Sequence, residues 1–81
     1  MDITGIIANN IKQLRKVNGL SQQDVAEAIS IDVSVYSRIE NGKTMASYDK
    51  LHNLSKLYRI PIEKFFKGWA VIFKIIMITL K

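Results

Sequence analysis

The sequence predicts an all-α domain of five short helices, followed by an apolar C-terminal segment. Apolar residues recur at helical spacing in five consecutive stretches of residues 1–67, and no alternating pattern typical of a strand interrupts them. Residues that favour helix starts, and glycines that favour helix ends, separate these stretches. With 81 residues, 48% of them hydrophobic, the chain suits one small domain.

The first two helices are indicated by their apolar stripes and by the residues at their junction. The stripe of the first helix consists of Ile6, Ile7, Ile11, Leu14 and Val17. Gly19 suits the left-handed position just past a helix end. Ser21 is then expected to cap the second helix, at about residues 21–29, with Asp24 completing a capping box. The buried stripe of this helix consists of Val25, Ala26 and Ile29.

Three further helices are expected before residue 67. Asp32 can cap the third helix, at about 32–41, and Gly42 can end it. Ser47 is expected to cap the fourth helix, and Pro61 suits the first position of a short fifth helix. The inward or half-buried positions of the third helix are Val35, Tyr36 and Ile39. The stripe of the fourth consists of Leu51, Leu54, Leu57 and Tyr58, and that of the fifth of Ile62, Phe65 and Phe66.

The composition excludes several classes of function. Because the chain has no cysteine, it has no disulfide framework, no thiolate nucleophile and no cysteine-ligated zinc site. The single histidine, His52, cannot build a metal site alone, and the sequence has no glycine-rich phosphate loop. We therefore expect no enzyme, cofactor or metal. The N-terminus lacks the pattern of a signal peptide, so a cytoplasmic protein is expected.

The net charge of +5 permits binding to a phosphate backbone without demanding it. More specific is the pair of short helices at about 21–29 and 32–41, joined by a tight turn. Such a pair can hold one helix across a DNA backbone and lay the next in the major groove. Residues 19–26 read GLSQQDVA, and residues 36–43 read YSRIENGK. Over about residues 5–66, this sequence strongly resembles the Cro/cI repressor-type helix-turn-helix family, often called XRE.

The resemblance implies a lambda-repressor-like DNA-binding domain over residues 1–67, with residues 68–81 as an additional apolar segment. It also implies sequence-specific binding of double-stranded DNA and regulation of transcription. The expected regulator is a repressor that acts as a homodimer on a near-palindromic operator.

The expected base-reading residues lie on the third helix. Val33, Ser34 and Arg38 share an outward face once Tyr36 turns inward, and the matching positions of the family read base edges. Arginine can pair with guanine, serine can bond to several bases, and valine can touch a thymine methyl group. Ser37 is assigned to the same set, although it could contact a phosphate or simply lie at the edge of the groove. The alternative for Arg38 is a solvated helix charge.

Phosphate contacts are expected on both sides of this helix. Gln22 lies in the first turn of the second helix, where free N–H groups favour a phosphate, although it could simply be a solvated polar residue. In the resembling family, the corner formed here by Asn41 and Lys43 grips the sugar-phosphate chain, and Thr44 could join them. Asn41 and Gly42 are also good turn residues in their own right.

The resemblance further implies an ion pair between Arg15 and Glu40, which would fix the third helix against the first. Two local departures from the family are visible. Ser30 stands in the turn where glycine is common, and the loop before the fourth helix lacks its usual proline. Ser30 is expected to be strained or to shift the turn.

The C-terminal segment is the third departure. Ten of the twelve residues 69–80 are apolar, which is too short a stretch to span a bilayer as a helix. Its β-branched residues make a strand at least as favourable as a helix. It could form a dimer, fold back onto the monomer core, lie on a membrane surface, or be the remnant of a longer gene. We favour dimerisation through Phe65, Phe66, Trp69, Ile72 and Phe73.

An alternative function is that of an antitoxin-type protein, which uses this segment to bind a toxin or other protein and also binds DNA. A third possibility is a membrane-tethered or inert remnant, although no transmembrane span is expected.

Overall fold

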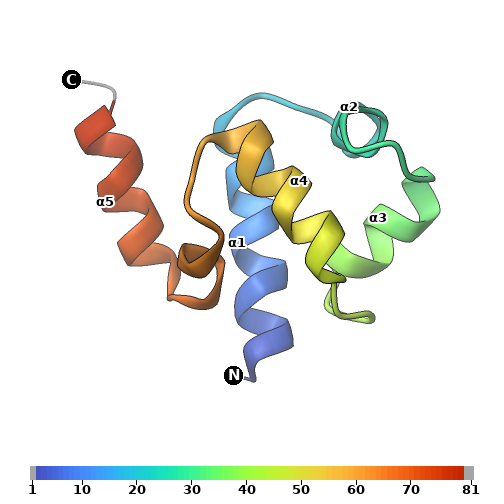
Figure 1. Ribbon diagram of the computed structural model, residues 1–81, viewed down its shortest axis with the longest axis horizontal. Coiled ribbons are helices and arrows are strands. Elements are labelled where there is room, and N and C mark those ends of the chain that lie inside the picture. Colours follow the sequence, from blue (N-terminus) through green and yellow to red (C-terminus); the bar gives the residue numbers. More distant parts are fainter. Residues whose placement is uncertain (1, 80–81) are drawn as a thin grey trace.

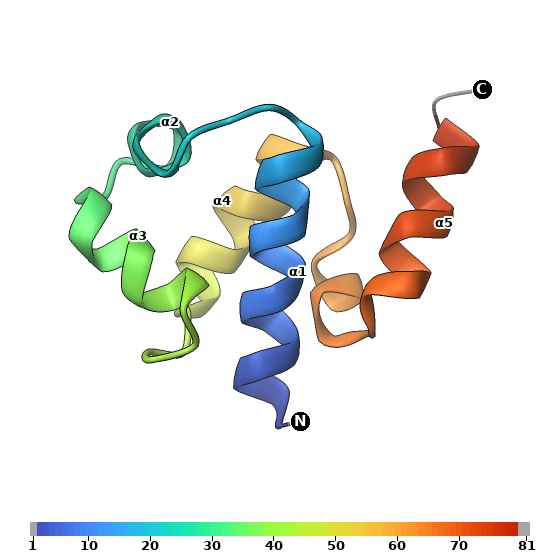
Figure 2. The ribbon, with the colours of Figure 1, turned by 180° about the vertical axis from the view of Figure 1, so that it is seen from behind.

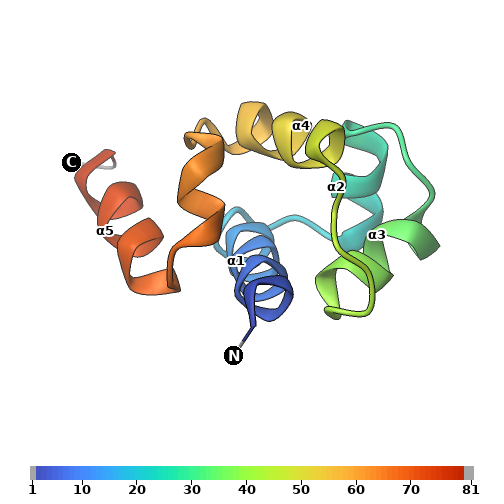
Figure 3. The same ribbon diagram turned by 60° about the horizontal axis from the view of Figure 1, so that its bottom comes forward.

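The computed structural model describes residues 2–79, which contain helices and no β-strand. Its elements are α1 (Ile3–Val17), α2 (Gln22–Ala28), α3 (Val33–Glu40), α4 (Tyr48–Tyr58), the 3-10 helix η1 (Ile62–Phe66) and α5 (Trp69–Thr79). Figures 1 and 2 show α1 in the middle of the molecule, with α2 and α3 on one side and η1 and α5 on the other. In Figure 3, α4 crosses above α1 and connects the two sides. The predicted all-α fold is confirmed.

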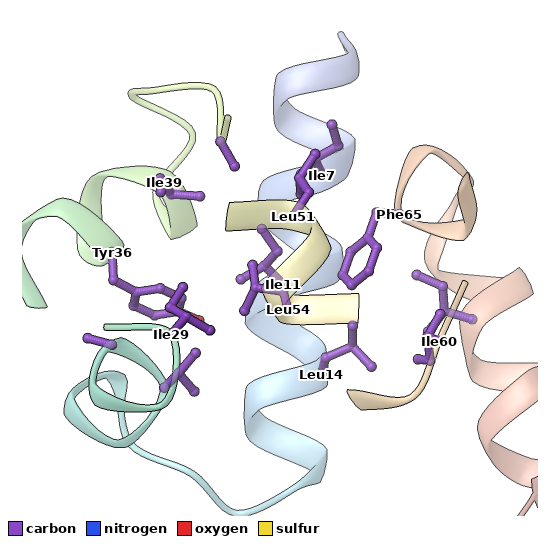
Figure 4. Packing of buried hydrophobic residues seen from close by; sticks show 14 residues of the cluster. Ile7, Ile11, Leu14, Ile29, Tyr36, Ile39, Leu51, Leu54, Ile60 and Phe65 are labelled. Atoms are coloured by element: carbon purple, nitrogen blue, oxygen red, sulfur yellow. The ribbon is translucent and has the colours of Figure 1, made fainter. Parts of the chain in front are cut away.

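The core forms where the apolar faces of these helices meet around α1 (Figure 4). The α1 stripe supplies Ile7, Ile11 and Leu14, each at most 1% exposed. The other labelled core residues are Ile29, Tyr36, Ile39, Leu51, Leu54, Ile60 and Phe65. Because these residues come from every part of residues 1–67, their burial holds the helix pair α2–α3 in a defined orientation.

Most of the predicted helix ends are confirmed. Ser21 and Asp24 form both hydrogen bonds of the capping box, and Ser47 accepts a hydrogen bond from the Lys50 N–H at 3.4 Å. Gly19 and Gly42 adopt φ of +68° and +74°, the left-handed conformation that glycine tolerates without steric cost.

The prediction for Asp32 is partly wrong, because Asp32 occupies the N-cap position of α3 but its side chain makes no capping hydrogen bond. Two ends were not predicted. Asp2 caps α1 by accepting from the Gly5 N–H at 2.9 Å, and Arg59 ends α4 at φ +57°. Aspartate is a preferred N-cap residue, so the signal for the start of α1 was available at Asp2, whereas arginine is not a preferred left-handed residue.

The expected short fifth helix is the five-residue 3-10 helix η1, and it begins at Ile62, so that Pro61 is its N-cap and not its first residue. The residues beyond it form the α-helix α5, and the strand alternative is therefore wrong. Trp69, Ile72 and Ile76 pack against the core at helical spacing. This packing against α1 and η1 outweighs the β propensity of the individual residues. Within residues 2–79, no helix has the length and apolar character needed to cross a membrane.

The packing of α5 also corrects two expected dimer contacts. Phe65 and Ile72 are completely buried in the monomer core, so their side chains cannot contact a second copy in this conformation. They were assigned to an interface because sequence alone does not separate the inner from the outer face of an apolar helix. Trp69 is half-buried, whereas Phe66 and Phe73 are 40% and 47% exposed.

Asn10 joins the C-terminal part to α1. Its side chain is completely buried, and Nδ2 donates to the carbonyl oxygens of Phe65 at 2.8 Å and Lys67 at 2.6 Å. These bonds hold the turn between η1 and α5 against the central helix. The available signal was a polar residue within the apolar stripe of α1, since Asn10 lies beside Ile11 and three positions after Ile7.

Candidate nucleic-acid interface

The turn between α2 and α3 is held by local hydrogen bonds and contains one residue with a strained backbone. The Ile31 N–H donates to the Ala26 carbonyl at 2.9 Å, and the Ser30 N–H donates to the Glu27 carbonyl at 3.1 Å. Ser30 adopts φ +59°, the left-handed conformation in which glycine is the easier residue. The Ser30 backbone is therefore strained, which is one of the two outcomes expected from the sequence.

The outward face of α3 carries the side chains expected to read bases. Val33, Ser34 and Arg38 are exposed, whereas Tyr36 and Ile39 point into the core. Ser37 is half-buried at the edge of this face, and its Oγ accepts a hydrogen bond from the Asn41 amide at 3.3 Å. An exposed helix face with a cation, hydroxyls and a small apolar group has the chemistry needed for base edges in a major groove.

Arg15 and Glu40 form the expected ion pair between α1 and the end of α3. Arg15 Nε donates to Glu40 Oε2 at 2.9 Å, and Nη2 donates to Oε1 at 2.8 Å, so the pair is bidentate. The third guanidinium nitrogen, Nη1, donates to the Leu20 carbonyl at 3.0 Å. The Glu40 side chain is 1% exposed and that of Arg15 15% exposed. The pair is thus largely removed from solvent, and it fixes both helices in position.

The electrostatics around Glu40 reflect this burial. Burial alone raises the pKa of the Glu40 carboxyl, but hydrogen bonds, foremost those from Arg15, lower the pKa below its usual range. The hydrogen bond with Glu40 raises the pKa of the Arg15 guanidinium. Burial and then the Glu40 charge raise the pKa of the Tyr58 hydroxyl to about 12. The Glu40 carboxylate is therefore ionised at neutral pH, and its negative charge raises the pKa values of the neighbouring Arg15 and Tyr58.

The residues expected to contact phosphates lie on both sides of α3. Asn41, Lys43 and Thr44 are exposed around the left-handed Gly42, where donors can reach a strand passing the end of α3. Gln22 is half-buried, and its Nε2 donates to Glu40 Oε1 at 3.3 Å, a contact that the sequence did not indicate. Gln22 thus lies next to the Arg15–Glu40 pair, at the start of α2.

The comparisons with known proteins agree with this arrangement. A family model described as "Helix-turn-helix" matches residues 11–65. The chain is 31% identical over 62 residues to the HTH-type transcriptional regulator DdrOP3 of Deinococcus deserti. It is 38% identical over 66 residues to the control protein C.MunI of a Mycoplasma species. The matched regions cover 76% and 80% of this chain, respectively, and 48% and 89% of the relatives. The chain thus spans about half the length of the Deinococcus regulator.

Proposed function

Because this chain belongs to the Cro/cI-type helix-turn-helix family, we propose that it binds specific sequences of double-stranded DNA and regulates transcription. The observation that carries the proposal is the outward face of α3, where Val33, Ser34 and Arg38 are exposed on a helix locked to α1 by a buried ion pair. A rigid helix with these groups on one side can enter the major groove and hold its contacts in register.

Each of these side chains has a distinct role in this proposal. Arg38 donates to guanine O6 and N7, Ser34 and Ser37 bond to base edges, and Val33 contacts a thymine methyl group. Asn41, Lys43, Thr44 and Gln22 bind phosphates and thereby set the orientation of α3. The names of the two relatives, a transcriptional regulator and a control protein, support the regulatory role.

The same proposal includes a homodimer on a near-palindromic site. One recognition helix reads few base pairs, and family members hold two of them about 34 Å apart. The outer surface of α5, together with the end of η1, exposes large apolar side chains that can pack against a second copy. These residues, which we call the α5 surface, are Phe66, Val71, Phe73, Met77 and Ile78. An exposed apolar surface of this kind favours a protein interface.

A separate pocket lies on the inner face of α5. Its volume is about 270 Å³, and it lies between the end of α1, the end of α4 and the inner face of α5. The lining residues are Leu14, Val17, Asn18, Tyr58, Arg59, Ile60, Ile75 and Ile76. The pocket is largely apolar, since five of the eight lining residues are aliphatic, and it shares no residue with the α5 surface.

Repression is the simplest regulatory outcome, because a dimer bound at a promoter excludes other proteins from the same DNA. Selection of binding sites from random duplexes, followed by salt titration and sizing of the complex, tests the proposal. We expect enrichment of a near-palindrome bound by two copies, with an affinity that falls as salt rises. Failure to enrich any sequence would contradict specific DNA binding. Co-purification of a different chain bound to the α5 surface would instead favour the antitoxin-type function.

A further inference from the structure

The Glu40 carboxylate binds a third group besides the two nitrogens of Arg15. Gln22 Nε2 donates to Glu40 Oε1 at 3.3 Å, and this oxygen also accepts from Arg15 Nη2 at 2.8 Å. Arg15 belongs to α1, Gln22 opens α2 and Glu40 ends α3. One buried carboxylate therefore joins three helices, including both helices of the α2–α3 pair.

The chemistry of this contact determines which edge of the Gln22 amide faces Glu40. A carboxylate only accepts hydrogen bonds, so it attracts the Nε2 edge and repels the Oε1 edge of the amide. The Nε2 atom carries two hydrogens, and Glu40 takes one of them. The other hydrogen remains available to an acceptor outside the protein, since Gln22 is only half-buried.

We infer that Glu40 is a positioning residue for a phosphate contact: it fixes the Gln22 amide so that its second N–H points to a DNA phosphate. This inference rests on the proposed DNA binding. Without Glu40, the amide can turn its oxygen toward the phosphate, and this orientation is repulsive. Side-chain order that exists before binding does not have to be gained on binding, so the fixed amide increases affinity.

The direction of the change in DNA affinity distinguishes a positioning role of Glu40 from a simple effect of its charge. Replacing Glu40 by glutamine removes one negative charge near the DNA, and charge alone therefore predicts tighter binding. Positioning predicts weaker binding, because a glutamine at position 40 can present either its oxygen or its nitrogen to Gln22. The two explanations differ in direction and not only in size.

A double-mutant cycle on the full chain tests the inference. We would measure the affinity of the wild type, Glu40→Gln, Gln22→Met and the double variant for the duplex obtained by selection. Circular dichroism would first establish a temperature at which all four retain native helix content. We expect Glu40→Gln to weaken binding about three- to tenfold in the wild-type background and not at all in the Gln22→Met background.

Gln23 provides a matched control. It is the next residue of α2, and its Nε2 donates to Glu27 of the same helix at 2.9 Å. Gln23→Met should show no coupling to Glu40→Gln. Equal weakening by Glu40→Gln with Gln22 or Met at position 22 would mean that Glu40 only supports α3, which would overturn the positioning role while leaving DNA binding intact.

Nuclear magnetic resonance of the Gln22 side-chain amide tests the contact without DNA. In the wild type, we expect one Nε2 hydrogen to exchange more slowly than those of Gln13, whose side chain makes no hydrogen bond within residues 2–79. This wild-type measurement remains decisive even if Glu40→Gln does not fold. Equal exchange at Gln22 and Gln13 would overturn the inference. A protected amide in a chain that binds no selected duplex would overturn the proposed function, and the phosphate contact with it.

Discussion

On one side of α1, Arg15 holds the end of α3 through the Glu40 carboxylate, whereas on the other side Asn10 holds the turn before α5 through two backbone carbonyl oxygens. The first attachment joins two charged side chains and leaves Arg15 15% exposed. The second is neutral, its Asn10 side chain is completely buried, and the Asn10 Oδ1 atom has no hydrogen-bond partner within residues 2–79. Both attachments restrict how a neighbouring element can rotate on α1.

The exposed surfaces on the two sides of α1 differ in polarity. The outward face of α3 carries a cation and hydroxyls, whereas the α5 surface is apolar, with Phe73 47% and Ile78 70% exposed. The comparison indicates that internal polar contacts set the orientation of each side, and that the exposed side chains set the kind of partner. DNA suits the first surface and a protein suits the second.

The largest effect on stability is expected at the charged attachment. Arg15→Ala leaves Glu40 buried without its cation, and it should lower the free energy of unfolding by about 3 kcal/mol, since Arg15 retains some contact with solvent. DNA affinity should fall with it. Chemical denaturation of Arg15→Ala, Glu40→Ala and the double variant measures the coupling. Additive losses would show that the two side chains do not interact in solution.

Asn10→Ala tests the neutral attachment. It removes one buried hydrogen bond to the Phe65 carbonyl and one partly buried hydrogen bond to the Lys67 carbonyl, and we expect a loss of about 2–3 kcal/mol in the free energy of unfolding. Asn9→Ala is the matched control, because Asn9 is half-buried on the same helix and its side chain makes no hydrogen bond within residues 2–79. If the two variants were equally stable, the Asn10 contacts would not hold the C-terminal part in solution.

Phe73→Asp tests the α5 surface at a residue that is not part of the buried core. Sedimentation should shift from dimer to monomer, and affinity for the full palindrome should fall about 100-fold while affinity for a half-site changes little. The control is Leu57→Asp, which adds the same charge at an exposed apolar residue of α4. A dimer that survives Phe73→Asp would place the interface elsewhere.

Arg38 and Lys43 compare the two kinds of DNA contact within the polar surface. Arg38→Ala should reduce affinity for the selected site by about 1–3 kcal/mol and relax the preference at one base pair. Lys43→Ala should weaken binding to all sequences similarly and reduce the slope of the salt dependence by about 1. Binding measured against single-base variants of the site distinguishes these patterns. Uniform weakening by both changes would remove Arg38 from the base-reading set.

The smallest effect on the free energy of unfolding is expected from lowering the pH. The pKa of Glu40 is lower in the folded chain than its usual value of 4.5, so the unfolded chain binds more protons just below that pH. The stabilisation is therefore complete above about pH 4.5 and decreases as the pH falls through the folded pKa. Denaturation between neutral and acidic pH should show a shallower decline for Glu40→Gln than for the wild type. Identical declines would show that Glu40 does not contribute to acid sensitivity.

Much of the helix-turn-helix part could be predicted from its residues, because the signals are local. Ser21 with Asp24 begins α2, Gly42 ends α3, and the inward direction of Tyr36 places Arg38 outside. The Arg15–Glu40 ion pair was predicted only from the resemblance to the family, because no local sequence pattern links residues 25 positions apart. The Gln22–Glu40 contact was missed for the same reason.

The sequence by itself determined the all-α class, the end of α1, the start of α2, the end of α3, the start of α4, and the polar character of the α3 face, because caps, glycines and helical periodicity act within a few residues. Only the tertiary structure decided that residues 69–79 form a helix, that Ile72 lies inside while Phe73 lies outside, and that Asn10 holds the preceding turn. These outcomes depend on α1 and η1 as packing surfaces. A segment apolar on nearly every side contains no periodicity to indicate which side another element will cover.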